Sequence, residues 1–300
     1  MRSPAVKTGY IPIDKTDTIN KMLMDLFNGR GYDSMDFVKN YRQESLPTDV
    51  KYAGRAIEDW RDGNPIHVGQ SGKLLRSLKF YAWTQGVRRE FVVEGTLRGR
   101  KTCDRPEIAD YSQRKLLSLE DDDTTQFASA KVLLGDEYRM DNPPFKLKQA
   151  YESYREWNLA RLDGKMWKVR PDSTIERQAD AMRVYVKSGS TRTEPVQPED
   201  YPLYRVFGKM TPEEGERMWG RKLRNHESDR IEETEKIIAE VKRREPISSR
   251  DHRVIVAGVA LQLRMKHKIE ATHMEEVAKS WPQFPKYAEY LESEIKYKRI

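Results

Sequence analysis

The segment from His252 to Met265 is apolar on nearly every side and constrains the fold more than any other part of the chain. A helix of this composition must be covered by other elements on all its faces. Its longest almost unbroken apolar run, Val254 to Leu261, is far shorter than the roughly 20 residues that cross a bilayer. We therefore expect a buried helix at the centre of a folded unit and no membrane span.

Further helices are indicated by apolar residues at 3.6-residue spacing, with a glycine or a proline at the end of most of them. The pattern predicts helices over residues 16–28, 71–86, 124–135, 176–189 and 228–244, and a last one around 287–295. The strand-like sequence REFVVEG follows the second of these helices. Helices that alternate with strands in an irregular repeat predict an α/β or α+β protein.

Charge and cysteine content restrict the partners and the compartment. Lys and Arg number 55 against 48 Asp and Glu, so the net charge is +7 and the pI is about 9.2, which favours an anionic partner. The single cysteine, Cys103, forms no internal disulfide, and the first residues lack the apolar core of a secretory signal. We expect a cytoplasmic protein without a structural zinc, since the five histidines include no H-E-x-x-H pair.

Polar and basic residues gather where the predicted helices begin. Such clusters lie at 15–16, 69–72, 124–126, 227–230 and 252–253. The backbone N–H groups and the positive dipole end of a helix start suit a phosphate or a carboxylate, although Ser, Thr and Asp at any one start are also ordinary caps. The glycine-rich sequence GQSGK at 69–73 fails as a nucleotide phosphate loop, because His67 and Leu74 stand where that motif needs Gly and Ser or Thr. The acidic run at 120–123 fits a solvated helix start better than a metal site.

Three segments of the C-terminal third resemble, in order, motifs of the 3-phosphoshikimate 1-carboxyvinyltransferase (EPSP synthase) family of the shikimate pathway. Residues 223–243 (LRNHESDRIEETEKIIAEVKR) resemble its K-E-[ST]-D-R segment. Residues 248–263 (SSRDHRVIVAGVALQL) resemble its D-D-H-R-x-A-M helix, and residues 275–291 (EEVAKSWPQFPKYAEYL) resemble its K-[ST]-F-P-x-[FY] ending.

Four looser matches precede them in the order of the family. Residues 13–29 are similar to its G-S-K-S opening helix, and residues 68–78 to its N-[AS]-G-T-x-x-R segment. Residues 93–108 are similar to the glycine, arginine and R-P segment that follows, and residues 122–135 to S-S-Q-[FY]-x-[ST]-A-L-L. The resemblance covers nearly the whole chain.

The resemblance implies a two-lobed fold of repeated βαβαββ units. Residues 13–170 are expected to form a reduced, acceptor-side N-terminal lobe, because the chain is short between Pro106 and Thr124. Residues 1–12 with 171–300 are expected to form the phosphoenolpyruvate-side lobe. The implied reaction moves the enolpyruvyl group of phosphoenolpyruvate to shikimate 3-phosphate or a related acceptor, as in aromatic amino acid biosynthesis.

The resemblance also implies roles for individual residues. Lys15, Asp200 and Glu227 are the expected catalytic residues, with Asp200 as the base on the acceptor hydroxyl and Glu227 as the acid that protonates the methylene carbon. The residues expected around phosphoenolpyruvate are Lys15, Gln70, Gly72, Arg98, Arg230, Arg253 and Lys279. Those expected around the acceptor are Thr16, Thr124, Thr125, Gln126, Asp200 and His226. We expect no metal and no cofactor.

Several positions depart from the family. His226 stands for a lysine, so a charge there depends on pH, and Asn20 or Lys21 stands for the arginine of the opening helix. These departures leave open a protein that keeps the fold and an anion-binding cleft but has lost the reaction. The basic clusters Arg98–Arg105 and Lys242–Arg244 leave nucleic-acid binding as a weaker alternative, because the net charge is modest. Cys103 is expected to be a loop residue, since it lies too close to Arg105 for the motif of the sister transferase that acts on a UDP-amino sugar.

Overall fold

The computed structural model describes residues 8–29, 34–99, 102–119, 122–135, 141, 143–224 and 229–296. The chain divides into two compact units, Ile13–Arg170 and, together, Met1–Pro12 and Pro171–Ile300. We call the first the N-terminal unit and the second the C-terminal unit. The N-terminal unit is thus an insertion in the chain of the C-terminal unit. The ligand roles expected for these two residue ranges stay predictions.

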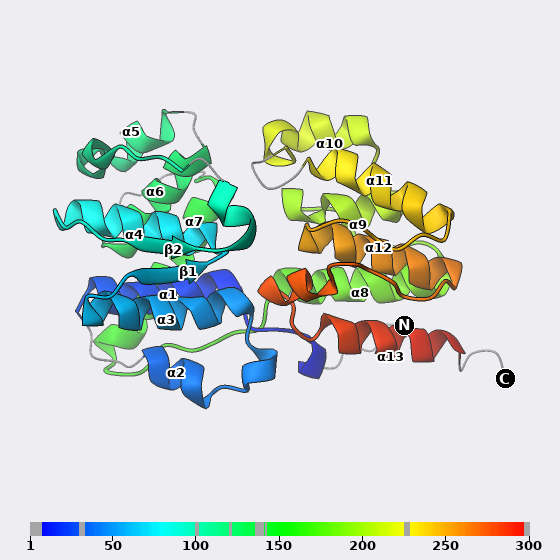
Figure 1. Cartoon of the computed structure of the whole chain (residues 1–300), viewed down its shortest axis with the longest axis horizontal. Coiled ribbons are helices and arrows are strands. Elements are labelled where there is room, and N and C mark those ends of the chain that lie inside the picture. The colour runs from blue at the N-terminus through cyan, green and yellow to red at the C-terminus, as the bar shows by residue number, and fades with distance from the viewer. Residues whose placement is uncertain are drawn as a thin grey trace. The chain divides into compact units, whose positions relative to one another are not determined.

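The N-terminal unit consists mainly of helices (Figure 1). They are α1 (Lys15–Phe27), α2 (Ser34–Asn40), α3 (Thr48–Asp62), α4 (Gly72–Thr84), α5 (Gln113–Leu117), α6 (Asp122–Leu133) and α7 (Phe145–Leu162). Two strands, β1 (Ile66–Gly69) and β2 (Phe91–Val93), pair in parallel. Short 3-10 helices span Gln43–Ser45, Gly95–Gly99 and Pro106–Asp110.

The C-terminal unit is built around one buried helix. Its helices are α8 (Ser173–Ser188), α9 (Tyr201–Val206), α10 (Pro212–Trp219), α11 (Arg230–Lys242), α12 (His252–Met265) and α13 (Phe284–Lys296), with 3-10 helices at Thr8–Tyr10, Pro198–Asp200, Gly220–Lys222 and Met274–Lys279. α12 packs against α8, α9, α11 and α13, and every residue from Val254 to Ala260 is buried. The prediction of a buried central helix is confirmed.

The expected α/β (α+β) fold of repeated βαβαββ units is wrong. In the described residues β1 and β2 are the only strands, and the other regular elements are helices. The apolar faces of these helices pack on one another where the expected fold would pack them on sheets. In the C-terminal unit, for example, the stretch between α11 and α12 contributes one isolated bridge, Ile247 to Ala271, and no strand.

Helix α3 lies in a region for which no helix was predicted. Val50, Ala53 and Ile57 are completely buried at helical spacing, and Gly63 ends the helix in the left-handed conformation that a residue with a Cβ rarely adopts. α3 therefore packs between α1 and β1. Among the described helices, none is both long and apolar enough to span a membrane.

Candidate functional site

Helices α11 and α12 begin side by side in the C-terminal unit. Asp251, the N-cap of α12, accepts a hydrogen bond from Nε of Arg230, the first residue of α11, at 2.9 Å. The other oxygen of the same carboxylate accepts from the backbone N–H of Arg253 at 2.9 Å. One buried acid thus joins the first turns of both helices, and the positive ends of two helix dipoles lie together.

The charge of Asp251 is stabilised by its cationic neighbours. Burial raises the pKa of the Asp251 carboxyl, but the charges of Arg230, His252 and Arg253 outweigh burial and hold the pKa below the usual range of an aspartic acid. Asp251 is therefore an anion at neutral pH. Arg230, which is almost fully buried itself, has a permanent counter-charge at this place.

Arg253 is the more accessible arginine of the pair. A quarter of its side chain is exposed, and its Nη2 forms a loose ion pair with Oε1 of Glu199 at 4.0 Å. Glu199 lies in the 3-10 helix that precedes α9. An ion pair this long leaves the guanidinium free to turn toward a better acceptor.

Lys279 is brought to the same end of α12. The next residue, Ser280, lies with its Oγ 3.2 Å from Nε2 of His252, which is the first residue of α12. The Lys279 ammonium pairs with Glu276 at 2.5 Å. Arg230 and Arg253 lie at the start of α12, and Lys279 is the residue before Ser280, which contacts that start, so the structure brings three residues predicted for phosphoenolpyruvate to the same end of α12. Glu199 and Glu276 are acids whose place a ligand could take.

Asp200, the predicted base, is held by structural contacts on every side. Its carboxylate accepts from Nη2 of Arg177 at 2.9 and 2.7 Å and from Nε2 of Gln178 at 2.8 Å. The backbone N–H groups of Val196 and Gln197 donate to it at 2.8 and 3.2 Å. Because the side chain is completely buried, Asp200 would have to give up one of these contacts to accept a proton from a substrate.

A second polar region lies in the N-terminal unit, where β1 ends and α4 begins. The turn passes through Gly69, whose φ of +57° and close approach to the ring of Tyr52 both exclude a Cβ. Oε1 of Gln70 accepts from the backbone N–H and the hydroxyl of Thr96, at 3.4 and 3.3 Å, just after β2. Ser71 does not cap α4 with its side chain, and the first turn of α4 contains no acid. The carboxyl ends of both strands and the start of α4 therefore share one end of this unit.

Two other helix starts of the N-terminal unit are tied together, and α4 is tied to α6. Lys15 at the start of α1 pairs with Asp49 at the start of α3, with 3.0 Å between Nζ and Oδ2. Nε of Arg76 in α4 donates to Oε1 of Gln126 in α6 at 2.5 Å. Thr16 is the second residue of α1 and is partly exposed.

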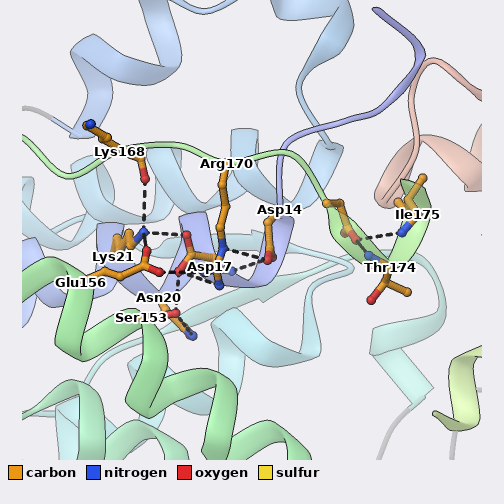
Figure 2. A network of polar contacts seen from close by, with 11 residues as sticks. Asp14, Asp17, Asn20, Lys21, Ser153, Glu156, Lys168, Arg170, Thr174 and Ile175 are labelled. Carbon is orange, nitrogen blue, oxygen red and sulfur yellow. Dashed lines mark hydrogen bonds and ion pairs between the residues drawn. The ribbon is translucent and has the colours of Figure 1, made fainter. Parts of the chain in front are cut away.

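The position of α1 depends on a partly buried network of charges (Figure 2). The ammonium group of Lys21 is buried and donates to Asp17 at 2.7 Å, to Glu156 of α7 at 2.6 Å and to the carbonyl of Lys168 at 3.2 Å. Arg170 pairs with the same Glu156 at 2.9 Å. All three donors of Lys21 are satisfied, so Lys21 anchors α1 against α7.

The other candidate for the family's arginine is a structural residue as well. Asn20 is fully buried in the same region, and its Nδ2 donates to Ser153 of α7 at 3.1 Å. Both Asn20 and Lys21 therefore serve contacts inside the N-terminal unit.

Of the remaining predicted residues, Arg98 lies beside the carboxyl end of β2. Arg98 is exposed, and its Nε donates to the carbonyl of Val93 at 3.2 Å. The side chains of Thr124 and Thr125 lie outside the description, although both residues belong to α6. His226 and Glu227 lie outside the described residues altogether.

Lys15 belongs to the N-terminal unit and Arg253 to the C-terminal unit. The expected meeting of these two residues in one pocket stays a prediction. So do the acceptor-side roles of Thr16 and Gln126.

Several polar residues of these regions were missed from the sequence. Asp49, Tyr52 and Glu94 form a small set in the N-terminal unit, where the Tyr52 hydroxyl donates to Glu94 at 2.6 Å. The hydrogen bond to Glu94, followed by burial, raises the pKa of the Tyr52 phenol. The apolar residues of α3 at helical spacing were the sequence signal for this helix. Recognising them would have placed Asp49 and Tyr52 in its first two turns.

The described residues contain no group of three or more His, Cys, Asp or Glu side chains arranged to hold a metal ion. No known protein family, curated protein or solved structure matches the chain.

Proposed function

We propose that the chain binds a small anion that carries both a phosphate and a carboxylate, the class to which phosphoenolpyruvate belongs, at the start of α12. The observation that carries this proposal is the gathering of Arg230, Arg253 and Lys279 at one end of the C-terminal unit. A ligand with about three negative charges needs several cationic groups to replace its hydration, and arginine matches phosphate and carboxylate oxygens in pairs.

The ligand would exchange partners within the site. Arg253 and Lys279 now pair with Glu199 and Glu276, whose carboxylates mimic the oxygens of an anionic ligand. Arg230 would keep Asp251 and so fix the two helix starts. The positive dipole ends of α11 and α12 add to the attraction for the phosphate.

Enolpyruvyl transfer to shikimate 3-phosphate or a related acceptor is the reaction we propose to test first, because it follows from the sequence resemblance. The contacts of Asp200 favour the second candidate function, binding without this reaction, since Asp200 is buried and committed to Arg177 and Gln178. The cytoplasm stays the proposed location, which the single cysteine of the chain supports.

Calorimetric titration of the full chain with phosphoenolpyruvate tests the binding proposal. Arg253→Gln should weaken binding about tenfold or more, because it removes charged hydrogen bonds. Arg217→Gln is the matched control, because Arg217 is an exposed arginine on α10 of the same unit. Absence of binding to the unaltered chain, or equal affinity in Arg253→Gln, would contradict the proposal.

Phosphate release from phosphoenolpyruvate, measured with and without shikimate 3-phosphate, separates the two candidate functions. Release that requires the acceptor supports transfer. Binding of phosphoenolpyruvate without release supports a binding protein.

A further inference from the structure

A hollow of about 320 Å³ lies at the other ends of α11 and α12, away from the site proposed above. The two helices begin side by side, and the residues that follow them line this hollow together. Among the residues that line it are Arg244, Glu245, Gln262, Lys266, His267 and Glu270. This hollow has room for a small polar ligand.

A basic residue in the left-handed backbone region follows the last turn of each helix. Arg244 has a φ of 61° and Lys266 a φ of 58°, and in the described part of the chain no other residue except glycine has a positive φ. Both lie in the hydrogen-bonding pattern that ends a helix on a left-handed residue: the backbone N–H of Glu245 donates to Glu240 at 2.9 Å, and that of His267 donates to Gln262 at 2.8 Å.

Glycine is the residue that this position normally requires, because a Cβ is unfavourable there. The chain follows that rule at the ends of α3 and α8, where Gly63 and Gly189 have φ values of 75° and 83°. Arg244 and Lys266 are exceptions to this rule, and both residues line the same hollow. Strained residues of this kind are a mark of functional sites.

The charges in the hollow leave it positive. Glu245 is neutralised by Arg243, with 2.7 Å between Nη2 and Oε2, and Glu270 by Lys268 at the same separation. Arg244 and Lys266 form no ion pair with any residue that the structure describes. Two cations at the edge of a hollow thus lack a counter-charge.

His267 lines the hollow, and among the described residues one nitrogen of its ring has no hydrogen-bond partner. Nδ1 of His267 is buried and unpartnered within the described protein. The wall beside it is fixed, because the side-chain amide of Gln262 both donates to the carbonyl of Glu270, at 3.0 Å, and accepts from its N–H, at 3.2 Å. A ligand oxygen at this place would satisfy the His267 nitrogen.

We infer that this hollow binds a phosphate group, with Arg244 and Lys266 as the charged ligands and Nδ1 of His267 as a hydrogen-bond donor. A guanidinium and an ammonium group are the two cations that most often hold phosphate oxygens in proteins. The phosphate belongs either to a small metabolite or to a nucleic-acid backbone, which present the same group.

The competing explanation is that both basic residues only complement the negative dipole ends of α11 and α12. Lysine or arginine in the last helical turn would do this without the left-handed backbone, and Lys242 and Arg264 already occupy those turns. The helix dipole therefore explains why basic residues lie at these helix ends, but it does not explain why they occupy left-handed backbone positions.

Glycine substitutions separate the two explanations, because glycine suits the backbone while it removes the cation. Thermal unfolding of the full chain is measured with and without inorganic phosphate, and with a short single-stranded oligonucleotide. Arg244→Gly and Lys266→Gly should keep or raise the unfolding temperature without phosphate and should lose most of the phosphate-induced rise. Lys266→Arg should keep that rise. Lys286→Ala, which removes an exposed lysine of α13 outside the hollow, should also keep it.

The imidazole nitrogen signals of ¹⁵N-labelled protein give a second readout. His267, assigned through His267→Gln, should shift with phosphate in the unaltered chain and in Arg253→Gln, and not in Lys266→Gly. A response to the oligonucleotide that exceeds the response to phosphate would identify a nucleic-acid backbone as the source. Equal phosphate effects in the unaltered chain and both glycine variants, or no effect in any of them, would overturn the inference.

Discussion

Arg177 and Asp200 form an ion pair in which one guanidinium nitrogen, Nη2, lies 2.9 and 2.7 Å from the two carboxylate oxygens. The pair joins α8 to the 3-10 helix before α9. Asp200 has no exposed surface, so its carboxylate is shielded from water, although a quarter of the Arg177 side chain is exposed. This arrangement gives Asp200 a measurable structural role apart from any role in a reaction.

Asp200→Asn should lower the free energy of unfolding by about 2–3 kcal/mol, because several hydrogen bonds to a charged acceptor are weakened at once. Urea unfolding at pH 7 measures the loss. Asp180→Asn is the control, since Asp180 of α8 is substantially exposed, and it should change stability by no more than about 0.5 kcal/mol. An Asp200→Asn protein of unchanged stability would show that the contacts around this carboxylate do not stabilise the fold.

Asp25 offers an independent test inside the N-terminal unit. Its two carboxylate oxygens accept from the indole N–H groups of Trp157 and Trp167, each at 2.8 Å, and all three side chains are buried. Asp25→Ala should cost about 2–4 kcal/mol, because two buried donors lose their acceptor. It should also change the tryptophan fluorescence of the folded protein. Asp62→Ala, at the exposed end of α3, should do neither.

The sequence predicts the helix starts of the C-terminal unit because the signals are local. Asp229 has capping-box spacing to Glu232, and two residues separate Asp251 from the apolar stretch that begins at Val254; both cap the helices that follow, α11 and α12. The three cations around α12 lie near such local features. Three of the seven residues that the resemblance implies around phosphoenolpyruvate therefore lie near locally encoded helix starts, while their role as ligands stays a prediction.

Helix α1 shows why the rest was not predictable. Its spacing predicts a half-buried helix, but Asp17, Lys21 and Asp25 are buried together with its apolar residues. Their partners Glu156 and Trp157 lie on α7, more than 130 residues further along the chain. A polar residue is expected to be exposed until such a distant partner is known, and so the sequence alone predicts only a half-buried helix.

The sheet prediction failed for a related reason. α7 buries Ser153 between its apolar positions, so its apolar stripe is interrupted and the helix escapes detection. Without α3 and α7, the gaps between the predicted helices were long enough to hold strands. The family that the sequence resembles has strands between its helices, and so strands were expected in those gaps.

Gly95→Ala tests the packing between the two strand ends. Gly95 has a φ of +49°, and a Cβ there would lie 2.4 Å from Cδ of Gln70. The substitution should lower stability by about 1–2 kcal/mol from the backbone alone and should push Gln70 away from Thr96. Gly99→Ala, in the same 3-10 helix, meets no atom within 4 Å and has no positive φ. Equal unfolding temperatures of the two variants would contradict this account.

The pair of Arg230 and Asp251 should make stability depend on acid pH. The pKa of Asp251 is lower in the folded state than in the unfolded state, where it is about 3.9. The ionised Asp251 therefore contributes its full stabilisation when the pH is above about 3.9, and this stabilisation is lost as the pH falls below that value toward the folded-state pKa. Arg230→Met should lower stability at pH 7 by about 3–5 kcal/mol, because the carboxylate is left buried without its main cation. It should also raise the pKa of Asp251, so that the further loss of stability between pH 5 and 3 becomes smaller than in the unaltered chain.

Urea unfolding at pH 7, 5, 4 and 3 and constant ionic strength measures both effects, and the difference between the two proteins isolates Asp251 from the other carboxylates. The double variant Arg230→Met with Asp251→Asn is the control, and it should regain part of the stability lost at pH 7. If Arg230→Met lost stability between pH 5 and 3 as steeply as the unaltered chain, the ion pair would not be the source of the acid sensitivity.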